Sequence, residues 1–474
     1  MMPYGQLADN SRQNKRKGDS MSGLQGLKVV DLTIFAAAPG CARLLAELGA
    51  TVYKIEREIG DDQRTQGVSW GMKFKTDIDD AAFDCGGFNR RWVSLNLKTE
   101  KGMEAMLKLL SDADVFITSN RTPALKRMGL DYETLHKKFP RLVWAQLRGY
   151  GERGEMADEQ GYDAITYSAR GGVTMSFPNA GEHFEVGNSP VAFGDWNSSN
   201  ALAVGILAAL WNAQRTGVGD KVVTSLYHVS NWGMMSAICA QQQGQPHPKN
   251  RAEAPCPTNN SYVTSDGVWF VMCFGNYNKF HRKVFEAIGM DPKYWEDESY
   301  TSLEALAQNG KNVEVIAEME RIFKQKTWAE WEPYLMEQEL ACEKCRTVED
   351  VLHDKEAFDN DQLRRVYYED QGYGEDHSYT ITTAPVRLAS LGDPVLYRSR
   401  PVGYDTREVL EELGYSDSEI DAFDADGSVR CYAGEPMPES VLQPSYGLYP
   451  ANAQEAQELA DARAAEEAAV KNWQ

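Results

Sequence analysis

Hydrophobic runs alternate with helix-like spacing through the first half of the chain. Residues 27–32 and residues 51–56 are short apolar runs, which are typical of buried strands. Between them, Pro39 suits the first turn of a helix and Gly49 suits its end. A strand, a helix and a strand in such close succession form a βαβ unit, whose two strands are parallel. The pattern therefore predicts a parallel sheet.

The same alternation continues as far as residue 226. Apolar residues with helical spacing precede further apolar runs, and a long apolar helix precedes the last strand. These segments are a helix at residues 103–110, strands at residues 114–118 and 142–147, a helix at residues 200–214 and a strand at residues 221–226. We therefore expect one large α/β domain over residues 23–225.

The pattern changes in the second half of the chain. A long helical stretch at residues 227–243 leads into a loop rich in Pro and Asn. Asp266-Gly267 separates two short strands, which is a strong signal for a β-hairpin. Helices are predicted at residues 277–288 and 313–324. Residues 226–380 are therefore expected to form a linker helix and a smaller α+β domain.

Both ends of the chain differ from the middle. Residues 1–22 carry a basic cluster but no apolar signal-peptide core, so we expect a disordered lead-in. Residues 451–474 are rich in Ala and Glu and are expected to form an exposed helix or tail. Before that tail, one clear helix is predicted at residues 406–413.

The composition is that of a globular protein, with 42% hydrophobic and 25% charged residues among 474. Asp and Glu outnumber Lys and Arg by 70 to 49, and the resulting net charge of −21 disfavours a nucleic-acid binder. No apolar run approaches the roughly 18 residues of a membrane span. The eight cysteines form no disulfide framework, so we expect a reducing cytoplasm.

Several common kinds of site lack their motifs. Glu56 closes the second strand, where dinucleotide-binding folds place a ribose-binding acid, but the turn at residues 34–40 lacks the glycine fingerprint. The motifs of P-loop nucleotide hydrolysis, zinc proteolysis and serine hydrolysis are also missing. Cys342 and Cys345 form a lone CxxC pair, whereas a zinc site would need a second pair. We therefore expect no metal site.

Short motifs in a fixed order carry a resemblance to a known family. They are residues 24–33, 48–57, 60–61, 89–91, 93–98, 124–132, 149–151, 161–163, 194–195 and 217–222. Together they resemble the class III CoA-transferases, and the similarity extends over about residues 24–415. Residues 124–130, 171–173 and 250–255 are most similar to the branch that acts on aryl-lactates and other 2-hydroxy acids.

The resemblance implies a fold and an assembly. The family has a discontinuous Rossmann-like large domain built from both chain ends, so residues 381–450 are expected to return to it. A smaller α+β domain lies in the middle of the chain. Two chains form a homodimer of interlocked rings, and neither nucleic acid nor a membrane is an implied partner.

The resemblance also implies the activity and its central residue. The family moves CoA between carboxylic acids, so an acyl-CoA and a free carboxylate are substrates and no cofactor is bound permanently. Its catalytic aspartate matches Asp195, whose carboxylate would attack the acyl-CoA and form a mixed anhydride. From local sequence alone, Asp195, Asn197 or Ser198 could instead cap the helix that follows.

Four residues fall on positions that contact CoA in the family, and arginines suit its phosphates because they bind them bidentately. They are Arg57, Arg127, Met128 and Arg148. Other positions depart from the pattern of formyl-CoA transferase. Ile34 and Ala36 replace a His and a Gln that contact CoA there, and Ser119-Asn120 replaces an Asn-Phe pair.

Phe35, Tyr162 and Trp196 could line an apolar pocket for the acyl group, although such residues more often belong to the hydrophobic core. Tyr162 also separates the transferases from an alternative, the related α-methylacyl-CoA racemases. These have a catalytic histidine at this position, and tyrosine, with a reference pKa of about 10, is badly matched to that task. A second alternative is a non-catalytic CoA-binding protein, which the presence of Asp195 disfavours.

Overall fold

The structure is a computed structural model that describes residues 23–64, 67, 81–180, 185–245, 249–367, 378–392 and 395–434. The expected lead-in at residues 1–22 and the expected tail at residues 451–474 lie outside the described residues. Among the residues that are described, no helix is long and apolar enough to cross a membrane.

The chain divides into two compact units. The first contains the chain up to Gly171, Ser189–Gly233 and the chain from Lys355 onward. The second contains Gly172–Asn188 and Met234–Asp354. The first unit is therefore discontinuous in sequence.

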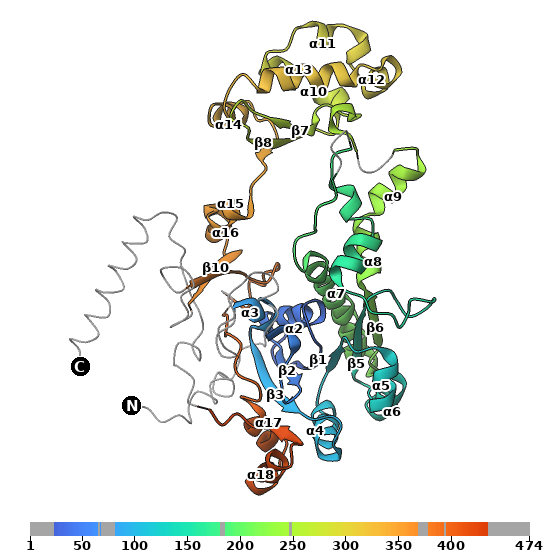
Figure 1. Cartoon of the computed structure of the whole chain (residues 1–474), viewed down its shortest axis with the longest axis vertical. Coiled ribbons are helices and arrows are strands. Elements are labelled where there is room, and N and C mark those ends of the chain that lie inside the picture. The colour runs from blue at the N-terminus through green and yellow to red at the C-terminus, as the bar shows by residue number, and fades with distance from the viewer. Residues whose placement is uncertain are drawn as a thin grey trace, which may run out of the picture. The chain divides into compact units, whose positions relative to one another are not determined.

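The first unit is built on a parallel sheet, as the apolar pattern predicts (Figure 1). The strand order within the described residues is β12-β3-β2-β1-β4-β5-β6, and only β12 is antiparallel to its neighbour. The strands are β1 (Lys28–Leu32), β2 (Thr51–Glu56), β3 (Arg90–Leu95), β4 (Val115–Thr118), β5 (Val143–Arg148), β6 (Lys221–Ser225) and β12 (Val429–Arg430). The order reverses between β1 and β4, and open α/β sheets bind ligands at the carboxyl ends of their strands at such a point.

Helices cover this sheet, and the longest described one is α7 (Phe193–Thr216). It packs closely on α2 (Ala37–Glu47), because Gly40 leaves room for the ring of Trp196 and because the Ser199 hydroxyl donates to the Ala37 carbonyl at 2.6 Å. The unit also contains α3 (Ala81–Gly87), α4 (Glu100–Leu110), α5 (Thr122–Met128), α6 (Tyr132–Lys138), a π-helix (Asp163–Arg170), α8 (Leu226–Gly233), α16 (Lys355–Asp359), β10 (Leu363–Tyr367), β11 (Ser378–Thr382), α17 (Thr406–Glu412) and α18 (Asp417–Ala425).

The second unit contains the predicted hairpin. Its two strands meet at Gly267, where φ is +79°, and a third antiparallel strand begins at Cys342. The elements are α9 (Met235–Gln242), β7 (Asn259–Val263), β8 (Trp269–Cys273), α10 (Tyr277–Ile288), α11 (Lys293–Glu296), α12 (Leu303–Asn309), α13 (Asn312–Phe323), α14 (Trp328–Glu337), β9 (Cys342–Lys344) and α15 (Val348–Leu352), with short 3₁₀ turns. The helical stretch expected at residues 227–243 is present as two helices, α8 and α9, which are divided at Met234, directly after Gly233.

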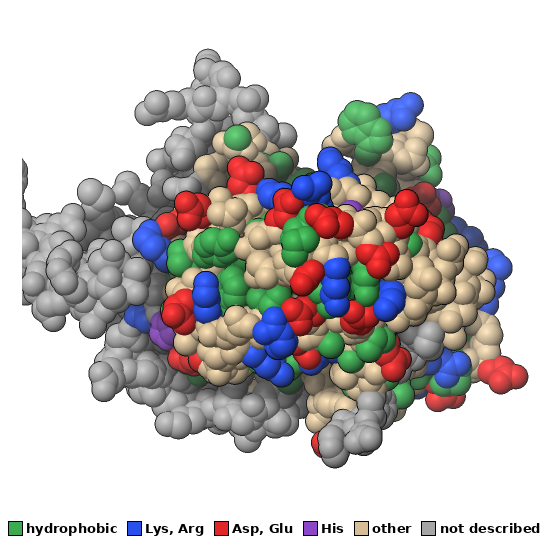
Figure 2. All heavy atoms as spheres, turned by 90° about the horizontal axis from the view of Figure 1, so that it is seen from above, with side chains coloured by type: hydrophobic (Ala, Val, Ile, Leu, Met, Phe, Trp, Pro, Cys, Tyr) green, Lys and Arg blue, Asp and Glu red, His purple; other side chains and the backbone are tan. Residues whose placement is uncertain are grey.

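One face of the molecule is shown as spheres in Figure 2. Lys and Arg side chains are interspersed there with Asp and Glu, and hydrophobic side chains lie singly or in small groups. A mixed face of this kind is typical of a solvated surface and offers no continuous basic area for a polyanion.

Candidate active site

The carboxyl ends of β1 and β4 are tied together where the strand order reverses. The backbone N–H of Ile34 donates to the Ser119 hydroxyl at 3.0 Å, and the Asn120 amide donates to the Leu32 carbonyl at 3.1 Å. Ile34 and the Ser119-Asn120 pair are positions where the chain departs from the formyl-CoA transferase pattern. In this chain, the residues at these positions form the hydrogen bonds that fix the loop after β1.

A buried ion pair holds the same loop from the other side. The Lys54 ammonium binds the Asp61 carboxylate at 2.8 Å and the Thr33 carbonyl at 2.6 Å, and both charged side chains are 1% exposed. The other Asp61 oxygen accepts from the backbone N–H of Phe35 at 3.4 Å. Although burial alone would raise the pKa of Asp61, the charge of Lys54 and the hydrogen bonds hold it below its usual value. Phe35 is thereby held with a left-handed φ of 63°.

Glu56 lies where dinucleotide-binding folds place a ribose-binding acid, but here its carboxylate binds other groups of the protein. One carboxylate oxygen accepts from Arg64 Nε at 2.8 Å and from the Asp61 N–H at 2.9 Å. The other accepts from Arg64 Nη2 at 2.8 Å. This bidentate pair orders the turn after β2, and the Glu56 side chain is 0% exposed, so a ribose hydroxyl cannot reach it.

Asp195 lies in the first turn of α7. The helix begins at Phe193, seven residues before the predicted start, and Ala192 at its N-cap has a left-handed φ of 58°. None of the three residues predicted as possible caps fills that role: α7 has no side-chain cap of its own, and the Asn197 amide instead donates to the Phe193 carbonyl at 2.8 Å. The local sequence left open that Asp195 caps this helix, and that alternative was therefore wrong.

The cap comes from another segment of the chain. Asp163, which opens the π-helix, accepts a hydrogen bond from the backbone N–H of Gly194 at 3.0 Å. A side chain at Gly194 would collide with the Tyr167 ring and with the Asp163 carboxylate. Only glycine therefore fits directly before Asp195.

The electrostatics of Asp195 follow from this arrangement. The residue is half-buried, and no side-chain hydrogen bond is made to it within the described part of the chain. Burial, reinforced by the negative charge of Asp163, raises the pKa of Asp195 to about 7. Burial also raises the pKa of Asp163, despite its hydrogen bond from Gly194. Near neutral pH, Asp195 is therefore a more basic carboxylate than an exposed aspartate.

Two of the three aromatic residues predicted for the acyl pocket lie together. The rings of Phe35 and Tyr162 meet edge to face with centroids 6.0 Å apart, and Tyr162 is 50% exposed. Since Tyr162 directly precedes Asp163, this pair lies in the same neighbourhood as the first turn of α7. Trp196 is half-buried and packs toward Gly40 on α2.

Arg148, a predicted CoA contact, is saturated by protein acceptors. Its guanidinium donates from Nε to the Gly151 carbonyl at 2.8 Å and from the two terminal nitrogens to four more acceptors. Those acceptors are the Thr122 hydroxyl, the Gln146 amide oxygen, the Ala157 carbonyl and the Asp158 carboxylate. A guanidinium has five N–H groups, so all of them are in use. The side chain holds the loop after β5 in place.

Of the other predicted CoA contacts, Arg57 and Arg127 are more exposed to solvent than Arg148. Arg57, just after β2, has a side chain that is 53% exposed and pairs with Asp62 at 2.5 Å. Arg127, in the last turn of α5, is exposed, whereas its neighbour Met128 packs against the hydrophobic core of the unit. Arg57 and Arg127 can therefore reach a phosphate without breaking a buried network.

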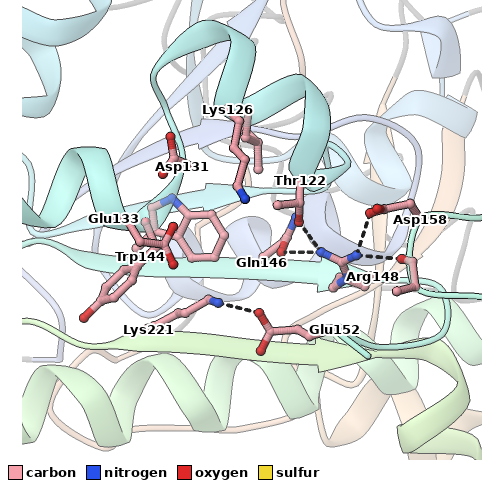
Figure 3. Close-up of a pocket in the computed structure, with 13 residues that line it drawn as sticks. Thr122, Lys126, Asp131, Glu133, Trp144, Gln146, Arg148, Glu152, Asp158 and Lys221 are labelled. Carbon is pink, nitrogen blue, oxygen red and sulfur yellow. Dashed lines mark hydrogen bonds and ion pairs between the residues drawn. The ribbon is translucent and has the colours of Figure 1, made fainter. Parts of the chain in front are cut away.

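A cavity of about 230 Å³ lies beside Arg148 (Figure 3). Its lining carries charges of both signs, and Lys221 pairs there with Glu152 while its ammonium lies over the rings of Tyr132 and Trp144. Asp195 does not line this cavity. Of the predicted site residues, the cavity includes Arg148 alone.

Comparisons with known proteins agree with the motifs. A family model described as CoA-transferase family III matches residues 24–406. The chain is 35% identical to (R)-2-hydroxy-4-methylpentanoate CoA-transferase of Clostridioides difficile, over 86% of this chain and 99% of that protein. It is also 35% identical to cinnamoyl-CoA:phenyllactate CoA-transferase of Clostridium sporogenes, over 85% and 96%. A solved CAIB/BAIF family protein from Brucella suis matches with a TM-score of 0.64 and 25% identity, over 83% and 100%.

Proposed function

Because the chain belongs to CoA-transferase family III, we propose that it moves CoA between two carboxylic acids through covalent intermediates on Asp195. The observation that carries this proposal is the carboxylate in the first turn of α7. It is half-buried, its pKa is raised to about 7, and it has no side-chain partner within the described residues. These are the properties of a carboxylate that is poised to attack an acyl group.

The chemistry proceeds in two matched halves. An Asp195 oxygen attacks the thioester carbonyl, the C–S bond breaks, and the CoA thiolate leaves a mixed anhydride on the enzyme. The thiolate then attacks the Asp195 carbonyl, which releases the donor acid and leaves an aspartyl-CoA thioester. The acceptor carboxylate attacks this thioester and forms a second anhydride, and the returning thiolate takes the acceptor acyl group and restores Asp195. One thioester is exchanged for another, so each step needs only the nucleophile and a site that limits hydrolysis.

The two relatives named for 2-hydroxy-4-methylpentanoate and phenyllactate support the same class of acid here. We propose that one substrate is a 2-hydroxy or aryl-substituted carboxylic acid and that the other is a related acyl-CoA, with no permanently bound cofactor. The edge-to-face rings of Phe35 and Tyr162 offer an apolar wall for the aryl or branched group.

A panel of acyl-CoA donors and free acids, followed by mass spectrometry, tests this proposal. We expect CoA to appear on 2-hydroxy and aryl acids and the donor acid to be released in equal amount. The same samples in deuterated water test the racemase alternative. Uptake of deuterium beside the carbonyl without CoA exchange would contradict the proposed function.

We propose that Arg57 and Arg127 contact the CoA phosphates, and that Arg148 supports the site structurally. Changing Arg57 or Arg127 to Ala should raise the KM for acyl-CoA about ten- to hundredfold with little change in kcat, because a charge-assisted hydrogen bond contributes about 1.5–3 kcal/mol. Arg148→Ala should instead lower the thermal stability, since it leaves five acceptors without a donor. Arg282→Ala, a change on α10 whose side chain is 66% exposed, is the control. An unchanged KM in both exposed variants would contradict this placement of CoA.

An exposed apolar stripe on α7 supports the expected homodimer. Val204, Leu207 and Trp211 follow helical spacing and are 68%, 36% and 64% exposed. A stripe of this size on one helix face is typical of a protein interface. We propose that a second copy covers it in the interlocked arrangement of the family. Light scattering should give twice the chain mass of 53.0 kDa, and an active species of 53.0 kDa would contradict the proposal.

We also propose a cytoplasmic location. All eight cysteines are free thiols in the structure. A reducing compartment keeps thiols in this state.

A further inference from the structure

The start of α7 is held from outside the helix. Its own N-cap, Ala192, has no side chain that could accept a hydrogen bond, and the orphan N–H of Gly194 is satisfied by the Asp163 carboxylate instead. Asp195 follows Gly194 directly. Thirty-one residues therefore separate the cap from the helix turn whose geometry it determines.

Asp163 is itself firmly placed. It opens a π-helix, a rare form that is frequently found at functional sites. The middle of this helix is anchored to α8, because the Ser230 hydroxyl donates to the Tyr167 carbonyl at 2.7 Å. The Tyr167 ring meets Phe193 of α7 edge to face, with centroids 6.2 Å apart. The same π-helix thus fixes both the carboxylate cap and the packing beside it.

We infer that Asp163 is a positioning residue for Asp195: its carboxylate orients the first turn of α7, and its negative charge strengthens the neighbouring carboxylate as a nucleophile. This inference rests on the proposed function, since it assumes that Asp195 carries the acyl group. A carboxylate cap does both tasks at once, whereas an amide or hydroxyl cap would only orient the helix.

Other titratable groups around the first turn do not supply this charge. On the packed elements these are Tyr167 and Arg170 in the π-helix, Cys41, Arg43 and Glu47 on α2, Tyr227 and His228 on α8, Arg148 on β5 and Lys221 on β6. The Arg170 guanidinium lies over the rings of Tyr150 and Tyr227, Arg148 donates to five protein acceptors, and Lys221 pairs with Glu152. Burial raises the pKa of both Tyr167 and Cys41, so each is neutral near pH 7. The Arg43 guanidinium donates hydrogen bonds to the Glu47 carboxylate and to two backbone carbonyls. Among the described residues, Asp163 is the one whose charge acts on the Asp195 carboxyl group together with burial.

Asp163→Asn and Asp163→Ala separate the two tasks. Asn keeps an oxygen that can accept from the Gly194 N–H but removes the charge, so the pKa of Asp195 should fall and the ionised form should persist at lower pH. The midpoint of kcat/KM for acyl-CoA against pH should therefore move to lower pH by about one unit, with kcat kept within about tenfold. Ala removes the cap as well and should lower kcat by a further tenfold or more, about the effect of losing 1.4 kcal/mol of orientation.

A second readout does not depend on turnover. Carbodiimide modifies protonated carboxyl groups, so its labelling of the peptide that contains Asp195, followed by mass spectrometry from pH 5 to 9, reports the same titration. We expect the labelling midpoint to move with the activity midpoint in Asp163→Asn. Asp220→Asn, which removes one exposed charge beyond the other end of α7, is the control and should move neither.

The outcomes are distinct. Midpoints of labelling and activity that both move to lower pH support the inference. A labelling midpoint equal to that of the unchanged protein would overturn it, whatever the activity shows. A labelling midpoint that moves while the activity midpoint stays in place would support the charge effect and contradict the proposed role of Asp195.

Discussion

Replacing Asp195 with Asn is expected to abolish CoA exchange while the chain keeps its fold and its affinity for acyl-CoA. The amide has nearly the same shape as the carboxylate but cannot form an anhydride, so turnover should fall by about 10⁴-fold or more. The helix should be unaffected, because Asp195 does not cap it and Asp163 does. Initial rates of exchange and a binding titration with acyl-CoA measure the two halves of this prediction.

The same variant has a stability signature with a definite sign. The folded pKa of Asp195, about 7, lies above the ordinary value of 3.8, so ionisation of the folded protein costs stability as the pH rises. Asp195→Asn removes that cost. It should be more stable than the unchanged protein at pH 8, by an amount on the order of 1–3 kcal/mol after solvent screening, and equally stable at pH 4. Chemical denaturation at both pH values checks this, and a variant that is less stable at pH 8 would contradict it.

Asp61→Ala is expected to have the largest effect on stability. It leaves the Lys54 ammonium, 1% exposed, without its carboxylate partner, and the loss of one member of a buried pair costs about 3–5 kcal/mol. It also removes the acceptor of the Phe35 N–H, so exchange activity should fall even where the protein stays folded.

Asp62→Ala is the matched control for this change. Asp62 is the next residue, but its side chain is 54% exposed and pairs with the exposed Arg57. An exposed pair of this kind contributes about 0–1 kcal/mol. Denaturation midpoints should therefore differ strongly between the two variants, and equal midpoints would refute the structural role of the Lys54–Asp61 pair.

The fold could be predicted where local pattern suffices. The apolar runs at β1, β2 and β4 and the helical spacing of α10 gave their positions within one residue, whereas α4 begins at Glu100, three residues before its predicted start. β3 was not predicted as a strand, because it begins with Arg90 and Arg91, and Arg90 is neutralised by Asp31 at 3.0 Å on another strand. Such a partner is invisible to a local pattern.

The candidate site shows the same limit. The early start of α7 was missed because its cap is Asp163, which is far away in sequence. The motif Gly60-Asp61 was noted without a role, and the structure gives its aspartate one through Lys54 and Phe35. The saturation of Arg148 depends on carbonyls of a loop, which no residue pattern specifies.

Trapping the covalent intermediate tests the central claim most directly. The protein is incubated with acyl-CoA and hydroxylamine, digested, and its peptides are analysed by mass spectrometry. We expect a hydroxamate on Asp195 that requires acyl-CoA and is absent from Asp195→Asn. Exchange at the normal rate by Asp195→Asn, confirmed free of deamidation by peptide mass, or a hydroxamate on another residue in its place, would contradict the account.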